Sequence, residues 1–193
     1  MRHALLPNVT SNYQMKISKV PSNLKNLHQH WTSVNKIHDL MLNKDWFVAV
    51  SLCNQLIELV EYDFFGFYYR GQCNVKIKLF EEAISDFEIS LVNLERNRFP
   101  SLMKEYELEV KLRISNIFRL TRKYDKALSR IDELLREYPD YAEGHKEKAG
   151  VLSDMGDLKT AFESANQGLK LNPGDQELER FKNYLAMALI TKE

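Results

Sequence analysis

The 193-residue chain is poor in the residues that make turns and cross-links: it has seven glycines, five prolines and two cysteines. A β-protein needs many turn residues, so this scarcity favours an all-helical chain. Two cysteines, Cys53 and Cys73, cannot make a disulfide framework. A reducing compartment is therefore the default, and we expect a cytoplasmic protein. No apolar run approaches about 18 residues, so no membrane span is expected.

The chain also lacks an excess of charge of either sign. Lysine plus arginine and aspartate plus glutamate both total 27, so the formal net charge is zero. This balance gives no indication of a nucleic-acid partner. The distribution is uneven only at the start, because residues 1–38 contain no acidic residue. A flexible N-terminal segment over residues 1–21 is the expectation, and a transit peptide is the alternative.

Motifs of enzymes are missing as well. The chain has no glycine-rich phosphate loop, no HExxH and no CxxC. His28, His30 and His38 match no standard spacing of metal ligands, and we interpret them as isolated surface histidines. Cys53 and Cys73 fall at inward positions of helices, where a small buried hydrophobic residue is the simpler interpretation. We therefore expect no catalytic residue, no metal, no cofactor and no enzymatic activity.

Four alanines recur at a regular interval. The interval from Ala49 to Ala83 is the same as that from Ala127 to Ala161, while the interval between the two pairs is ten positions longer. The shorter interval matches a helix–turn–helix unit of about 34 residues with a small residue in its second helix, and so resembles the tetratricopeptide repeat. The resemblance extends over about residues 30–175, in four units: 30–63, 64–97, 108–141 and 142–175. Position by position, the matching small and turn residues are Gly71, Ser115, Ala149, Gly156, Pro139 and Pro173.

The resemblance implies an all-α fold: a right-handed superhelical solenoid of antiparallel helix pairs. Small side chains let the two helices of a unit approach closely where they cross. The expected organisation is the flexible segment 1–21, a repeat domain over 22–175 and a capping helix over 176–193. The first unit is degenerate, as expected of a terminal repeat that packs on one side only.

Helix ends can also be predicted. Pro139 and Pro173 should stop the second helices of the last two units, because proline lacks an N–H group. In the segment "DLKTAFESANQGLKLNP" (157–173) we expect Leu169 and Leu171 to point inward. Asp175 should cap the last helix, with glutamates in its first turn.

The ten extra residues of the middle interval lie around 98–107. Pro100-Ser101 is a helix start signal, so residues 101–120 are expected to form one lengthened helix. Such a helix would extend the wall of a groove, and a tolerated loop insertion is the alternative.

The predicted functional feature is a surface. In tetratricopeptide proteins the first helix of each unit lines a concave groove. By register, the groove residues would be Trp31, Val34, His38, Met41, Phe65, Tyr68, Gln72, Val75, Lys76, Glu109, Leu112, Asn116, Arg119, Glu143, Lys146 and Ser153, with Leu102 and Tyr106 from the lengthened helix. The expected partner contacts among them are Trp31, Val34, His38, Phe65, Tyr68, Gln72, Lys76, Leu112, Asn116, Arg119 and Lys146.

The N-terminal half of this groove is aromatic and apolar, which indicates a contact surface. The alternative is that the long first helix or the N-terminal segment covers it internally. A clamp for the acidic tail of a chaperone, known in some members of the family, is not expected, because only Arg113 fits it and Glu109 would repel an anion. The leading hypothesis is a non-enzymatic adaptor that binds a protein or peptide segment. The alternative is a structural subunit of a larger complex, or a homo-oligomer formed through the first repeat or the last helix.

Overall fold

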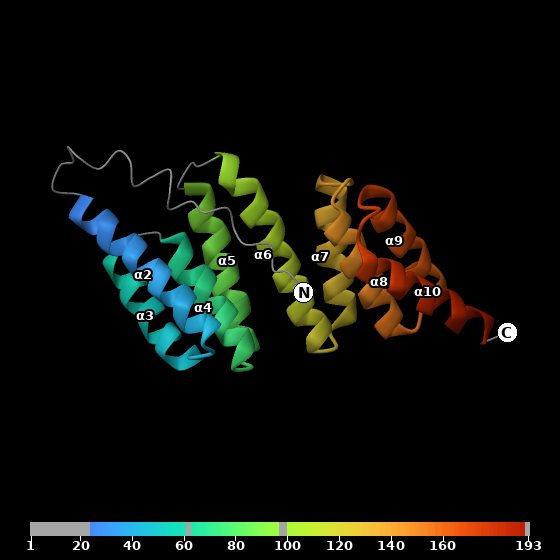
Figure 1. The fold of residues 1–193 in the computed structure, drawn as a ribbon, viewed down its shortest axis with the longest axis horizontal. Helices are drawn as coiled ribbons and strands as arrows, with labels where there is room; N and C mark the ends of the chain where they lie inside the picture. The colour runs from blue at the N-terminus through green and yellow to red at the C-terminus, as the bar shows by residue number, and fades with distance from the viewer. Residues whose placement is uncertain (1–23, 61–62, 97–99, 192–193) are drawn as a thin grey trace.

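The computed structural model describes residues 24–60, 63–96 and 100–191, which form nine α-helices and no strand. The helices follow one another along the long axis of the molecule, from α2 to α10 (Figure 1). Their bounds are α2 Leu24–Leu42, α3 Trp46–Leu59, α4 Phe64–Lys76, α5 Phe80–Arg96, α6 Pro100–Leu120, α7 Tyr124–Glu137, α8 Ala142–Met155, α9 Leu158–Leu171 and α10 Gln176–Ile190. The expected segment 1–21 and the side chain of Leu102 lie outside the described residues.

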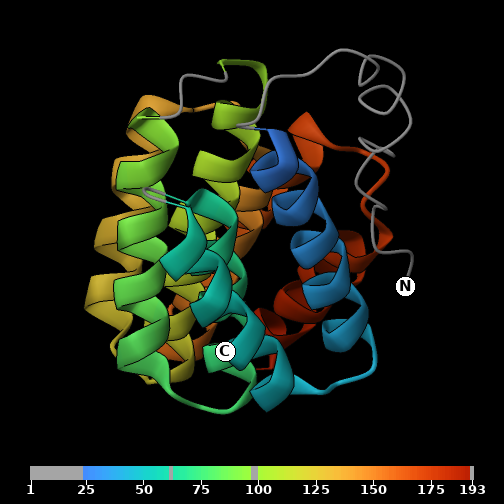
Figure 2. The same cartoon turned by 90° about the vertical axis from the view of Figure 1, so that its left-hand side faces the viewer.

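The helices pack as consecutive hairpins. Each helix contacts the next along the chain, and α2 also contacts α4 while α6 also contacts α8. The view along the stack shows α5 and α7 one behind the other on one side, with α2 on the opposite side (Figure 2). The pairs α2–α3, α4–α5, α6–α7 and α8–α9 are the four predicted units, and α10 follows as the predicted last helix.

Small residues lie where the helices cross, as predicted. Ala49, Ala83, Ala127 and Ala161 are all 0% exposed. Gly71 faces the ring of Phe87 so closely that a Cβ atom there would lie 2.9 Å from the ring atom Cε1. A larger side chain at these positions would force the two helices of a hairpin apart.

The turns inside the four hairpins are built alike. One or two residues after the end of the first helix of each unit lies a residue with positive φ: Lys44 (63°), Lys78 (65°), Arg122 (58°) and Gly156 (87°). These four residues repeat the intervals of the four alanines. In each turn the following N–H donates to the carbonyl five residues earlier, for example Leu79 N to Asn74 O at 2.8 Å. This is the Schellman arrangement, which usually places glycine at the left-handed position.

Three of these turns therefore carry a strained residue. A residue with a Cβ atom loses about 1–2 kcal/mol in the left-handed region, and the greater freedom of glycine in the unfolded chain offsets part of this difference. We expect Lys78→Gly to raise the free energy of unfolding by about 0.5 kcal/mol, and Gly156→Ala to lower it by about 1 kcal/mol. Urea unfolding followed by circular dichroism measures both. A loss of stability in Lys78→Gly would contradict the left-handed turn.

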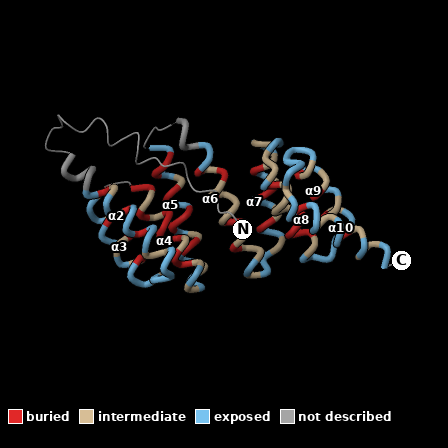
Figure 3. Tube along the Cα trace, in the orientation of Figure 1, coloured by how far each residue is buried: buried red, intermediate tan, exposed pale blue. Residues whose placement is uncertain are grey.

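The core runs through the stack between facing helices (Figure 3). Its largest cluster joins α2 to α6 and is rich in aromatic rings, among them Phe64, Tyr68, Phe87 and Tyr106. A second cluster joins α8, α9 and α10 through alanines and leucines.

Most of the predicted helix ends are confirmed. Helix α7 ends two residues before Pro139, and α9 ends two residues before Pro173. Asp175 caps α10 by accepting from the N–H groups of Glu177 and Leu178, at 3.1 and 2.9 Å. The inward placement of Leu171 is wrong: its side chain is 41% exposed. It is the last residue of α9, about 200° around the helix from the inward-facing Leu169.

Helix α6 has the predicted extra length and begins at Pro100. Its added turns are helical, so the alternative of a loop insertion is wrong. Tyr106, in this added part, is 9% exposed and packs against the rings of Phe64 and Tyr68, with centroids 4.9 and 5.4 Å away. The insertion therefore contributes to the core between α4 and α6.

Surface placement of His30 is also wrong. This histidine is 7% exposed, and its Nε2 lies 2.6 Å from Oδ1 of Asp63, which is 4% exposed. The other carboxylate oxygen of Asp63 accepts from the N–H of Gly66 and caps α4. Sequence spacing did not reveal this contact, because the two residues lie 33 positions apart on different helices.

Both cysteines are buried, as predicted, at 0% exposure. Burial raises the pKa of Cys73 to about 11 and raises the pKa of Cys53 further above its usual range. At neutral pH both side chains are therefore protonated thiols that pack as small hydrophobic residues.

Candidate functional site: a cleft on the first helices

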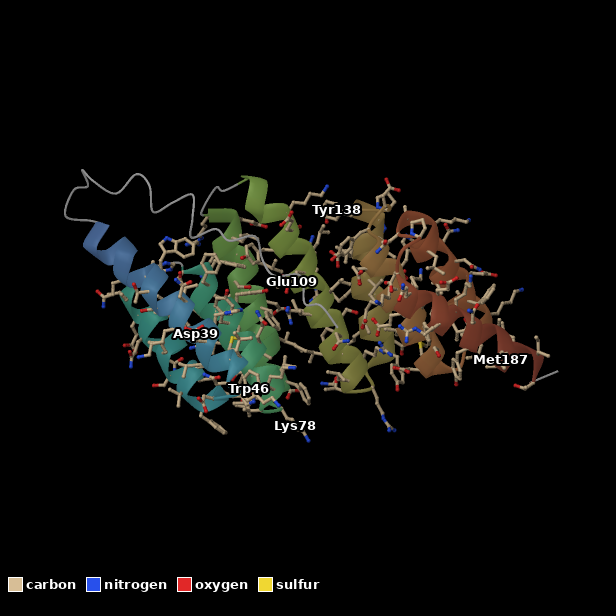
Figure 4. All side chains as sticks on the ribbon, viewed as in Figure 1. Asp39, Trp46, Lys78, Glu109, Tyr138 and Met187 are labelled. Carbon is tan, nitrogen blue, oxygen red and sulfur yellow. The ribbon has the colours of Figure 1, made fainter. Side chains whose placement is uncertain are left out.

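A cleft opens on the face that the first helices of the units form. It is a shallow, open cleft of about 240 Å³ lined by residues of α4, α6 and α8. Figure 4 labels Glu109, one of its wall residues, in the middle of the stack. The cleft is lined by Val75, Glu109, Leu112, Arg113, Asn116, Ile117 and Glu147. Five of these come from α6, which is therefore the central wall.

One side of the cleft is a hydrogen-bonded ion pair. Nε and Nη2 of Arg113 both donate to Oε1 of Glu109, at 2.9 and 2.5 Å. The hydroxyl of Tyr68 donates to the same oxygen at 2.7 Å. The pair sits one helical turn apart on α6, and Tyr68 ties it to α4. The carboxylate and the guanidinium therefore neutralise each other at the cleft wall.

The opposite side is a second ionic cluster that joins α6 to α8. The side-chain amide of Asn116 donates to Oε1 of Glu147 at 3.2 Å. Arg119 donates from Nε to Asp154 at 2.6 Å, and its Nη1 lies 3.6 Å from Glu147. Space for this guanidinium exists because residue 150 is glycine: a Cβ atom there would lie 2.5 Å from Nη1 of Arg119.

The environment shifts the ionisation of Glu147, which lines the cleft, and of Tyr68, a core residue hydrogen-bonded to the cleft residue Glu109. Burial raises the pKa of Glu147 above that of an exposed carboxyl, while Arg119 and Asn116 oppose this shift. Burial also raises the pKa of the Tyr68 hydroxyl well above its usual value, so it stays a hydrogen-bond donor. Both shifts follow from the burial of these groups away from water.

Two of the expected partner contacts are in the core. Val34 is 5% exposed and Tyr68 is 3% exposed. The helix α2 lies against α4 here, and the side chains of Trp31 and Phe65 meet with ring centroids 5.3 Å apart. The first helix thus covers much of the aromatic strip, which was the alternative considered for this part of the groove. Hydrophobic burial explains the difference, because these rings pack on one another within the chain.

The other expected contacts differ in their exposure and in whether they form ion pairs within the chain. His38 and Lys76 are exposed, and Trp31, Phe65 and Gln72 are half-buried. Lys146 donates to Asp175 and Glu177, both at 3.0 Å. Together with Arg119, it is held by carboxylates of the same chain. The structure brings together only Leu112 and Asn116 of the expected contacts at the cleft, along with the wider groove residues Val75 and Glu109.

Arg113, Ile117 and Glu147 line the cleft but were not among the expected groove residues, and Arg113 was considered only as a clamp position. For Glu147 the repeat register holds a signal, because it lies one repeat length after Arg113 and so occupies the same place in the next unit. Glu147 interacts with Arg119 of α6, whose long side chain extends to α8. Repeat register alone does not predict this contact.

Neither a metal site nor a membrane span appears in the described ranges. Residues 24–60, 63–96 and 100–191 hold no group of three or more metal-binding side chains. Within the same ranges, every helix is too short or too polar to cross a bilayer.

Among known proteins, the chain has similar solved structures but no match in sequence. No protein-family model matches the chain, and no curated protein matches it in sequence. Among solved structures, MamA residues 41 to the end from Desulfovibrio magneticus RS-1 is similar, with a TM-score of 0.64 at 12% identity, over 82% of this chain and 84% of that one. A chain of the APC/C hetero-tetramer Cut9–Hcn1 is similar with a TM-score of 0.66 at 16% identity, over 81% of this chain and 29% of that one.

These neighbours are tetratricopeptide-type proteins. The predicted fold class, a right-handed all-α superhelical solenoid of antiparallel helix pairs, is confirmed. The positions of the helices, the small residues at their crossings and the four matching turns agree with that result. The chain therefore has the fold of a tetratricopeptide-repeat solenoid, with four helical hairpins followed by α10 among the described residues.

Proposed function

We propose that this protein is a non-enzymatic interaction scaffold whose cleft between α4, α6 and α8 binds an extended segment of a partner protein. The observation that carries the proposal is the cleft itself, about 240 Å³ in volume and placed on the face of the first helices. Binding sites are usually concave, largely apolar and furnished with a few polar groups that fix orientation.

The chemistry of the cleft favours an apolar side chain of the partner at its centre. Val75 of α4 and Leu112 of α6 are half-buried and line the cleft together with Ile117, which is 1% exposed. One aliphatic or aromatic side chain of a peptide would contact all three. The amide oxygen of Asn116 is suitably placed to accept a backbone N–H of the same peptide, because its amide nitrogen is engaged by Glu147.

The charges around the cleft disfavour a strongly charged ligand. Glu109 is neutralised by Arg113, and Arg119 is shared by Glu147 and Asp154. An acidic peptide would have to displace a carboxylate from its arginine, and a basic peptide would have to do the reverse. A segment with little charge avoids both costs. Lys76 and His38 are exposed, and we propose them as additional contacts of the partner.

A display library of random peptides, selected on the full chain, tests the proposal. We expect enriched peptides with one apolar position, binding with micromolar dissociation constants. Leu112→Asp should weaken the binding of a selected peptide at least tenfold, since it puts a charge on the apolar lining of the cleft. The matched control is Leu120→Asp on the same helix, at a side chain that is 57% exposed and outside the cleft.

Fluorescence anisotropy of a labelled selected peptide measures both variants. Equal binding by the wild type and Leu112→Asp would show that the peptides bind elsewhere, and would overturn the assignment of the cleft. Circular dichroism of both variants separates a lost contact from a lost fold.

A further inference from the structure

Helix α2 covers an aromatic surface that α4 and α6 form. The rings of Trp31 and His30 lie against Phe65, with centroids 5.3 and 6.1 Å away. Phe65 in turn contacts the rings of Tyr106 and Tyr69, at 5.8 and 6.2 Å. We define the α2 seat as the N-cap residue of α4 together with these three rings: Asp63, Phe65, Tyr69 and Tyr106. The α2 seat is thus shielded from water by a helix of the same chain.

Only a narrow face of α2 holds it on the stack. Among its described side chains, those of residues 29–42, only His30, Val34 and Ile37 are buried. Trp31 and Met41 pack against the core from partly buried positions. These five inward positions follow the spacing i, i+1, i+4, i+7 and i+11, which is one face of a helix. Because α2 forms one end of the stack, the rest of its surface faces water (Figure 1).

The sequence of α2 forms a helix poorly on its own. Its exposed positions include Thr32, Asn35 and Asp39, which are weaker helix formers than alanine, leucine or glutamate. The helix has no acidic residue in its first turn and no basic residue in its last turn, where Asp39 opposes the helix dipole. The turn that follows contains Lys44 in the strained left-handed region. The helical state of α2 therefore depends mainly on its docking.

The polar contact on the inward face of α2 both weakens the docking and specifies it. Nε2 of His30 lies 2.6 Å from Oδ1 of Asp63, and both residues are buried. Nδ1 of the same ring is buried without a partner among the described residues, which is a cost that undocking removes. Asp63, for its part, needs a donor from any helix that occupies the α2 seat, because a buried carboxylate without one is strongly disfavoured.

We propose that α2 is a displaceable lid and that the α2 seat is a second binding site, which takes an amphipathic helix of a partner protein. The contacts of α2 describe that helix: a histidine, lysine or arginine facing Asp63, an aromatic residue directly after it, and aliphatic residues four and seven positions after the donor. Recognition is by a helix in a groove. Because α2 fills the site, the apparent affinity is lowered by the fraction of chains whose lid is open.

A synthetic helix tests this proposal on the full chain. The probe has the length of α2, 19 residues, keeps its five inward positions and carries alanine, glutamate, glutamine or lysine elsewhere, so it is a stronger helix than α2. Fluorescence anisotropy should show saturable binding. His30→Ala in the chain should tighten this binding at least tenfold, since its own α2 no longer pairs with Asp63 while the probe still does. The control Lys36→Ala, at an exposed position of α2, should leave it unchanged.

Hydrogen exchange followed by mass spectrometry locates the displacement. In the free chain the amides of α2 should exchange at least tenfold faster than those of α4, and saturating probe should remove the protection of α2 alone. Three results would each overturn the proposal: no binding to the wild type or His30→Ala, a bound probe with α2 still protected, or a wild type that dimerises in sedimentation velocity by exchanging α2 with a second copy. Leu112→Asp should not alter probe binding, so these outcomes are separate from those for the peptide cleft.

Discussion

Phe87→Ala is expected to lower the free energy of unfolding by about 3–5 kcal/mol. Phe87 is 0% exposed at the centre of the cluster that joins α2 to α6. Its ring fills the space above Gly71 and lies 6.4 Å from the ring of Tyr68, measured between centroids. Because Gly71 has no side chain that could move inward, the cavity would stay open, and the loss should lie at the high end of the range.

Equilibrium unfolding in urea, followed by far-ultraviolet circular dichroism, measures this loss. The matched control is Phe47→Ala, which removes the same side chain at a position that is 75% exposed. That variant should stay within about 0.5 kcal/mol of the wild type. Similar losses in the two variants would mean that Phe87 is not packed as described.

Asp63→Ala is expected to cost about 3 kcal/mol, more than the removal of an ordinary helix cap. Asp63 does two things: it caps α4 through the N–H of Gly66, and it pairs with buried His30 of α2. A cap alone contributes about 1 kcal/mol. The further cost arises because the His30 ring would keep its burial and lose its partner, and Nδ1 of that ring already has none among the described residues.

Asp157 provides the matched control for this prediction. It caps α9 by accepting from the N–H of Thr160 at 3.1 Å, but it is exposed and pairs with no histidine in the described part of the chain. Asp157→Ala should therefore cost only about 1 kcal/mol. If the two aspartates gave equal losses, the pair with His30 would contribute nothing. A double-mutant cycle of Asp63→Ala with His30→Ala would then give a coupling energy near zero.

The repeat fold was largely predictable from the sequence because its determinants are local and periodic. The regularly spaced alanines predicted where helices cross, and all four are fully buried. Pro139 and Pro173 predicted where second helices end, since proline acts on its own neighbours. The left-handed turns recur with the same period, but only one of them has glycine, Gly156, the residue type from which such a turn can be predicted. Lys44, Lys78 and Arg122 adopt the conformation because the turn requires it.

The candidate site was predictable only in part. Register assigned Leu112 and Asn116 to the groove, and both line the cleft. Register equally assigned Val34 and Tyr68 to the groove, yet they are in the core. The difference depends on how closely α2 lies against α4, and on Tyr106 of the lengthened α6, which packs onto the same rings. Spacing within one helix cannot give the position of another helix's side chains.

What the sequence determined by itself is the number, order and pairing of the helices, because apolar period, small residues and helix stops act within a few turns of one chain segment. The tertiary structure decided which polar and aromatic groups meet across units. His30 finds Asp63 at 33 positions away, and Arg119 reaches Glu147 and Asp154 over the bare surface of Gly150. Such contacts follow from the separation and rotation of neighbouring hairpins, which arise only when the whole stack packs.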